Sequence, residues 1–109
     1  MITTPLVACG DGQVELYEGL AEVGAAIECH DVHLYELFDA TGRRLSLQES
    51  GQGSLARPFE PPQHAEEVLR EYLLDWLRRV GPVVAPELEQ LPLTELVWRV
   101  SLLDGRQTD

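Results

Sequence analysis

The feature that most constrains the fold is an amphipathic segment at residues 65–80, bounded by a Pro-Pro pair before it and a Gly-Pro pair after it. Acidic residues at its start and arginines at its end match the helix macrodipole. Such a helix needs an apolar surface to cover, so the rest of the chain should supply one. Apolar side chains recur along one face of the predicted helix: Ala65, Val68, Leu69, Tyr72, Leu73, Trp76, Leu77 and Val80.

A β-hairpin is predicted where two β-rich runs, residues 32–38 and 43–48, flank the sequence Asp39-Ala40-Thr41-Gly42. Asp at the first position and Gly at the fourth are typical of a type I turn followed by a left-handed residue. Strand alternation then divides the side chains between two faces. One face would hold Val32, Leu34 and Phe38, with Leu45 and Leu47 as cross-strand neighbours, and the other His33, Tyr35, Leu37 and Asp39.

Weaker patterns predict the remaining elements. A Gly-Asp-Gly turn signal precedes a short strand at residues 14–17, and a helix is predicted from Glu18, with Leu20, Val23 and Ile27 at helical spacing. Residues 49–62 contain turn formers and three prolines, which predicts a surface loop. A short helical turn is expected at residues 86–90.

Residues 93–103 fit two patterns. Leu96, Trp98, Val100 and Leu102 alternate as in a strand, while a helix starting near Pro92 would leave Trp98 and Leu102 outside. Because large apolar side chains are usually buried, the strand is preferred.

These elements predict a single α+β domain over residues 1–109, with residues 105–109 as a tail. The expected order is β-α-β-β-α-β, in a small antiparallel or mixed sheet of about four strands with the long helix on one face. A chain of 109 residues is long enough to bury one core without disulfides.

The charge of the chain is strongly negative, since 19 Asp and Glu face 8 basic residues, for a net charge of −11. Such a field repels nucleic acid and anionic membranes and attracts basic protein surfaces. All the basic residues are arginine, and Lys and Asn are absent. Because AT-rich codons specify the missing residues, a GC-rich bacterial genome is expected.

Two cysteines, Cys9 and Cys29, form no pairing motif, which favours a reducing cytoplasmic setting. The run Leu6-Val7-Ala8-Cys9 matches a bacterial lipoprotein cleavage box, but "MITTP" before it supplies neither the basic nor the apolar part of a signal peptide. No apolar run reaches the ~20 residues that span a bilayer.

Residues 29–33, "CHDVH", hold the densest group of side chains that could bind a metal or transfer a proton. A zinc site here would use His30 and His33 with Cys29 or Asp31, yet no second ligand pair stands at a recognised spacing. Cys29 beside His30 does not make a catalytic pair, because a nucleophile and its base are arranged across the fold. We therefore predict no cofactor and no catalytic residue, and a polar junction between helix and strand. A metal-assisted or cysteine-dependent enzyme centred on this segment is the alternative.

Protein binding is the predicted function. Asp31, Tyr35 and Glu36 would place carboxylates beside an aromatic ring on the hairpin, a mixture suited to Lys or Arg of a partner. His33 lies among them, and the solvated face of the long helix adds Glu67 and Glu71. A homodimer formed through a sheet edge is a second alternative.

A pattern between residues 31 and 45 reads Asp31-Val32, then Tyr35-Glu36, then Asp39-Ala40-x-Gly42-Arg43-x-Leu45. It resembles short, acidic, mostly uncharacterised bacterial proteins, some of which are encoded beside toxins as immunity proteins. The resemblance carries over no catalytic residue. It implies a binding protein that works by occlusion, such as an immunity or inhibitor protein acting on a basic partner.

Overall fold

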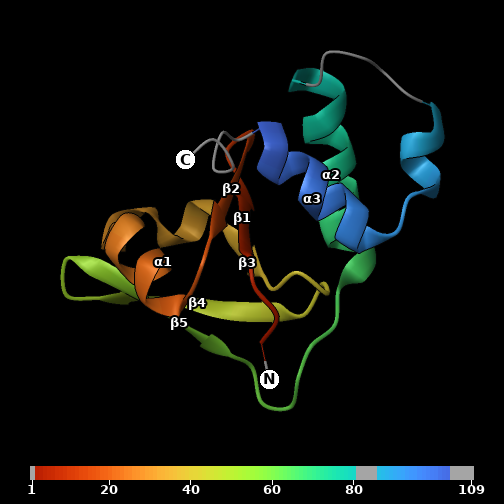
Figure 1. Ribbon diagram of the computed structural model, residues 1–109. Helices are drawn as coiled ribbons and strands as arrows, with labels where there is room; N and C mark the ends of the chain where they lie inside the picture. Colours follow the sequence, from red (N-terminus) through yellow and green to blue (C-terminus); the bar gives the residue numbers. More distant parts are fainter. Residues whose placement is uncertain (1, 81–85, 104–109) are drawn as a thin grey trace.

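The computed structural model describes residues 2–80 and 86–103, and in them five strands form one antiparallel sheet (Figure 1). The strand order is β2-β1-β3-β4-β5. The chain is therefore α+β as predicted, with five strands instead of about four. The strands are β1 (Leu6–Gly10), β2 (Gln13–Tyr17), β3 (Glu36–Phe38), β4 (Arg44–Ser50) and β5 (Gly53–Pro58).

Helices lie on both faces of this sheet. Figure 1 shows α2 and α3 side by side against one face, while α1 lies on the other, inside the curl made by β4 and β5. Two 3-10 helices, η1 and η2, join these parts. The bounds are α1 (Leu20–Ala26), η1 (Cys29–Leu34), α2 (Glu66–Val80), η2 (Pro86–Gln90) and α3 (Leu93–Leu103).

The interior strand β1, which lies between β2 and β3, is a part of the core that the sequence prediction missed. Its four residues from Leu6 to Cys9 have no exposed surface at all. Val7 and Cys9 contribute to the core under α2 and α3, whereas Leu6 and Ala8 contribute to the core under α1. A short continuous apolar run is typical of a strand that is buried on both faces. The run that resembles a lipoprotein box is thus a core strand. The predicted order β-α-β-β-α-β is wrong in three places, because it lacks β1 and β5 and ends in a strand where the structure has α3.

The long helix and the hairpin turn are confirmed. Helix α2 begins at Glu66 and ends at Val80, and Leu69, Leu73 and Leu77 of its stripe are buried. In the turn, the Gly42 N–H donates to the Asp39 carbonyl at 3.1 Å, and Gly42 has φ +91.

The first strand of the hairpin is shorter than predicted, because η1 continues to Leu34 and β3 begins only at Glu36. A Cβ atom on Gly10 would overlap the Leu34 carbonyl oxygen, so η1 crosses directly over the β1–β2 hairpin and cannot extend β3. The predicted division of faces is also wrong. Leu37, not Phe38, pairs with Leu45 in the core under α1, and Leu34 is exposed.

Residues 49–62 were predicted to be a loop, but they contain the end of β4 and all of β5. Strand β5 lacks an apolar alternation because its buried positions, Ser54 and Ala56, are small. They are small because α1 lies very close: a Cβ atom on Gly24 would stand 2.6 Å from the Ser54 carbonyl oxygen. Close packing of a helix on this edge strand therefore hides the strand signal in the sequence.

Residues 93–103 form the helix α3, so the preferred strand is wrong. Helical spacing buries Leu96, Val97 and Val100 in the core that α3 shares with α2 and the sheet, which offsets the exposure of the outer side chains. Trp98 is 53% exposed and Leu102 is 45% exposed. The predicted turn at 86–90 is confirmed as η2, and the predicted tail at 105–109 lies outside the described residues. Within the described ranges, no helix has the length and apolarity needed to cross a membrane.

Candidate functional site

The "CHDVH" segment forms the 3-10 helix η1, as a junction between α1 and β3. The His30 side chain is 70% exposed, and its Nε2 lies 3.3 Å from Glu28 Oε2 and 3.8 Å from Asp31 Oδ1. Across residues 2–80 and 86–103, no group of three or more His, Cys, Asp or Glu side chains is placed to hold a metal. The four donors of residues 29–33 therefore do not converge.

The two cysteines occupy structural positions. Cys29 is half-buried, and its backbone N–H donates to the Gln52 carbonyl at 3.1 Å. Burial, together with the nearby Glu36 carboxylate, raises the pKa of the Cys9 thiol to about 12. Because the thiolate is the reactive form, Cys9 is a poor nucleophile at neutral pH.

Glu36, a predicted partner-binding residue, is engaged inside the molecule. Its Oε1 accepts a hydrogen bond from the Tyr72 hydroxyl at 2.7 Å, and its Oε2 lies 3.2 Å from Arg44 Nη2. The hydrogen bond to Glu36 and burial raise the pKa of Tyr72 to about 12. Because Arg44 already neutralises the Glu36 carboxylate, this side chain links β3 to α2 and β4 and is not free to bind a partner.

Tyr35 lies on the opposite face of the sheet, where it packs against the core under α1. Burial raises the pKa of Tyr35, and so do the negative charges of Glu15, Asp31 and Asp11. These carboxylates come from three elements: the β1–β2 turn, β2 and η1. We call Asp11, Glu15, Asp31 and Tyr35 the Tyr35 cluster.

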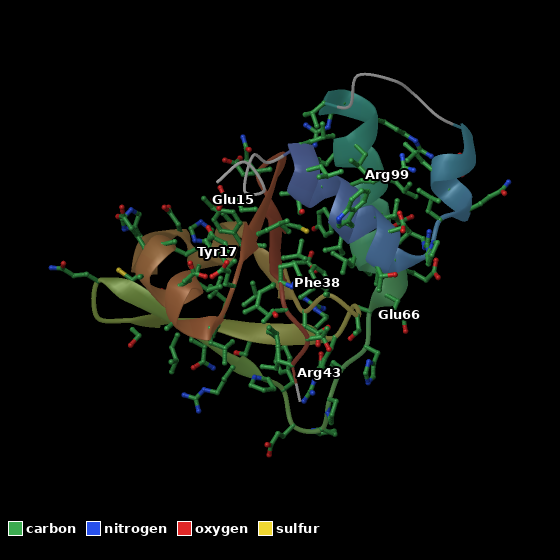
Figure 2. All side chains as sticks on the ribbon, viewed as in Figure 1. Glu15, Tyr17, Phe38, Arg43, Glu66 and Arg99 are labelled. Carbon is green, nitrogen blue, oxygen red and sulfur yellow. The ribbon has the colours of Figure 1, made fainter. Side chains whose placement is uncertain are left out.

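The carboxylates of the Tyr35 cluster have few partners. Glu15 accepts a hydrogen bond from the Tyr17 hydroxyl at 2.5 Å (Figure 2), and Asp31 is 3.8 Å from His30. In the part of the chain that the structure describes, no arginine forms an ion pair with any of the three. Arg79 approaches the β1–β2 turn, but it donates to the Gly12 carbonyl and pairs with Asp75. The cluster therefore carries an unneutralised negative field.

The six predicted partner-binding residues do not form one surface. Asp31 and Tyr35 come together as predicted, and His33 is exposed on η1 beside them in the chain. Glu67 and Glu71 are exposed on α2, which covers the other face of the sheet. Asp11 and Glu15 were missed at the level of the sequence because β1 was not identified. The pairing of β1 with β2 and with β3 is what brings these two residues near Tyr35.

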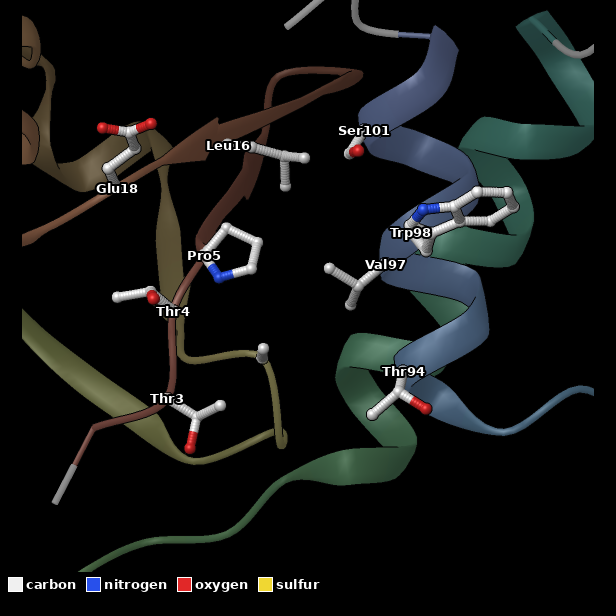
Figure 3. A pocket seen from close by; sticks show the side chains of 10 residues that line it. Thr3, Thr4, Pro5, Leu16, Glu18, Thr94, Val97, Trp98 and Ser101 are labelled. Atoms are coloured by element: carbon white, nitrogen blue, oxygen red, sulfur yellow. The ribbon is translucent and has the colours of Figure 1, made fainter. Parts of the chain in front are cut away.

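A second surface feature was not expected from the sequence. A groove of about 670 Å³ separates α3 from the segment that leads into β1 (Figure 3). One wall comes from the start of the chain and from β2, and the other from the side chains of α3 that face it. The lining residues are Thr3, Thr4, Pro5, Leu16, Glu18, Ala40, Thr94, Val97, Trp98 and Ser101.

Comparison of the chain with protein-family models, with curated proteins and with solved structures finds no significant match.

Proposed function

We propose that this protein is a protein-binding module that captures a basic partner on the Tyr35 cluster. The observation that carries the proposal is the set of three carboxylates, unpaired with arginine among the described residues, around the half-buried phenol of Tyr35. An arginine or lysine of a partner would relieve their mutual repulsion, and the tyrosine ring would supply contact area.

The net charge of −11 supports the same function in a different way. A field of this size raises the rate at which a basic partner approaches, while the local contacts determine how long it stays. We therefore propose that the protein acts by occlusion, as an immunity or inhibitor protein does, and we propose no catalytic role for it.

Charge reversal tests the location of the binding surface. The variant Asp11→Lys with Asp31→Lys changes the Tyr35 cluster, and Glu67→Lys with Glu71→Lys makes the same change of charge on α2. The protein would first be used at low salt to isolate a partner from the native organism, and association would then be measured by surface plasmon resonance. We expect the cluster variant to slow association about tenfold or more, and the α2 variant to have a much smaller effect.

Two results would contradict the proposal. The first is equal loss of binding in both variants, which would indicate attraction by net charge alone. The second is failure to isolate any partner with the wild-type protein.

A further inference from the structure

The exposed apolar side of α3 is the least explained surface of the molecule. Trp98 and Leu102 lie one helical turn apart and expose 53% and 45% of their surface. The inward residues of α3 already contact α2, so the packing of the helix does not require an indole on its outer side. Large exposed apolar groups that line a concave surface are typical of binding sites.

The polar groups of the groove indicate the charge of its occupant. The Glu18 carboxylate lies on the wall opposite Trp98 (Figure 3), and no arginine is among the described lining residues. Within residues 2–80 and 86–103, the Glu18 carboxylate accepts no hydrogen bond and forms no ion pair. The backbone N–H of Glu18 donates to Glu22 Oε1 at 2.6 Å. A cation that enters the groove on the side of β2 would therefore meet an unpaired carboxylate, while Val97 and Leu16 offer apolar surface between the two walls (Figure 3).

We propose that this groove binds an extended peptide segment in which a basic residue stands next to a large apolar one. The apolar side chain would pack against Val97, Leu16 and Trp98, and the cation would pair with Glu18. Thr3, Thr4 and Thr94 supply hydroxyl groups that can hydrogen-bond the peptide backbone.

A peptide suits the surface better than the other occupants. The exposed apolar surface of α3 continues one helical turn beyond Trp98 to Leu102, which does not line the groove, so an extended occupant can cover more of it than a compact small molecule. A second copy of the chain would bring a further net charge of −11 to a groove in which the one charged residue among the described lining residues, Glu18, is acidic.

This inference goes beyond the proposed function and does not depend on it. Leu16, which lines the groove, belongs to the core under α2 and α3, whereas Tyr35 packs against the core under α1. The Asp11→Lys with Asp31→Lys variant should therefore bind the peptide as the wild type does. Failure of the proposed partner binding at the Tyr35 cluster would not contradict peptide binding in the groove, and the reverse also holds.

Fluorescence anisotropy of a labelled peptide provides the test. The probe is the tetrapeptide Ala-Leu-Arg-Ala, blocked at both ends, and the matched peptides are Ala-Leu-Glu-Ala and Ala-Ser-Arg-Ala. We expect the probe to bind at least about fivefold more tightly than either matched peptide, because each lacks one of the two required groups. Trp emission should change on binding, and since Trp76 is buried and Trp98 is exposed, the change reports the groove.

Variants locate the site. Trp98→Ala and Glu18→Gln should each weaken binding of the probe about fivefold. Leu55→Ala, which removes another exposed apolar side chain, on β5, should leave binding unchanged. Circular dichroism would verify that each variant is folded. Equal binding of the Glu-containing peptide, or equal loss in Leu55→Ala, would overturn the proposal. So would binding of blocked arginine alone as tightly as the probe, or self-association that Trp98→Ala abolishes in sedimentation experiments.

Discussion

Two hairpin turns of this molecule use the same residue types for different purposes. The β1–β2 turn contains Asp11 and Gly12, both with positive φ, as in a type I′ turn. The β3–β4 turn begins with Asp39 and ends with Gly42. Asp11 is exposed and contributes its charge to the Tyr35 cluster, whereas Asp39 is only 1% exposed.

The hydrogen bonds explain the difference. Asp39 Oδ1 accepts from the Thr41 N–H at 2.8 Å, the Thr41 hydroxyl at 2.7 Å and the Arg43 N–H at 3.0 Å, and Oδ2 accepts from the Thr3 N–H at 3.1 Å. Burial alone would raise the pKa of Asp39, but these hydrogen bonds outweigh it and lower the pKa. The Asp39 carboxylate is thus occupied by hydrogen bonds from its own turn and from Thr3, whereas the Asp11 carboxylate remains available to a partner.

The largest expected difference between the turns follows from their glycines. A Cβ atom on Gly42 would stand 2.7 Å from the Glu66 Cα, and one on Gly12 would meet only Arg79 Nη1 at 3.8 Å. Both positions have positive φ, so alanine is strained in each. We expect Gly42→Ala to lower the free energy of unfolding by about 3 kcal/mol or more and Gly12→Ala by about 1 kcal/mol. Urea denaturation measures both, and equal losses would show that the turns are packed alike.

The aspartates should differ by a smaller amount. Asp39→Asn removes a charge that accepts four hydrogen bonds and places an amide donor against backbone donors, for an expected cost of about 2 kcal/mol. Asp11→Asn should cost less than about 0.5 kcal/mol, because asparagine tolerates positive φ. Thermal and urea denaturation of the two variants would test this, and a costly Asp11→Asn would remove the distinction.

The contribution of Asp39 to stability should depend on pH. The pKa of Asp39 is lower in the folded than in the unfolded protein, so the ionised carboxylate stabilises the fold. This contribution is fully present above the pKa of about 3.9 in the unfolded chain, and it is lost as the pH falls through the pKa in the folded protein. The difference in unfolding free energy between wild type and Asp39→Asn should therefore shrink as the pH is lowered through this range. Denaturation at a series of pH values measures it, and a constant difference would contradict the lowered pKa.

The smallest expected effect concerns Tyr35. Removing two charges in Asp11→Asn with Asp31→Asn should lower the pKa of Tyr35, although it should stay above its ordinary value because burial is the largest cause of the rise. An NMR titration of the tyrosine ring signals reports this pKa. Glu67→Gln with Glu71→Gln serves as the control and should leave it unchanged; no change in the first variant would mean that the charges do not act on Tyr35.

Part of the candidate site could be predicted from the sequence. Asp31 and Tyr35 were identified by their types, because an aromatic ring among acids suits a basic partner. Asp11 and Glu15 were not, since only the pairing of β1 with both β2 and β3 brings the β1–β2 hairpin beside Tyr35. The groove could not be predicted at all, because its walls come from opposite ends of the chain.

The sequence by itself determined the elements whose signals are local. Helix α2 carries its full apolar stripe between helix-stopping residues, and the turn from Asp39 to Gly42 contains its own hydrogen-bonding groups. Only the tertiary structure decided the rest. Strand β5 depends on the close approach of α1, and α3 is a helix because α2 and the sheet offer an apolar surface to Leu96, Val97 and Val100. The physical reason is that local hydrogen bonds and periodicity act within a few residues, whereas the burial that selects between strand and helix depends on surfaces distant in the chain.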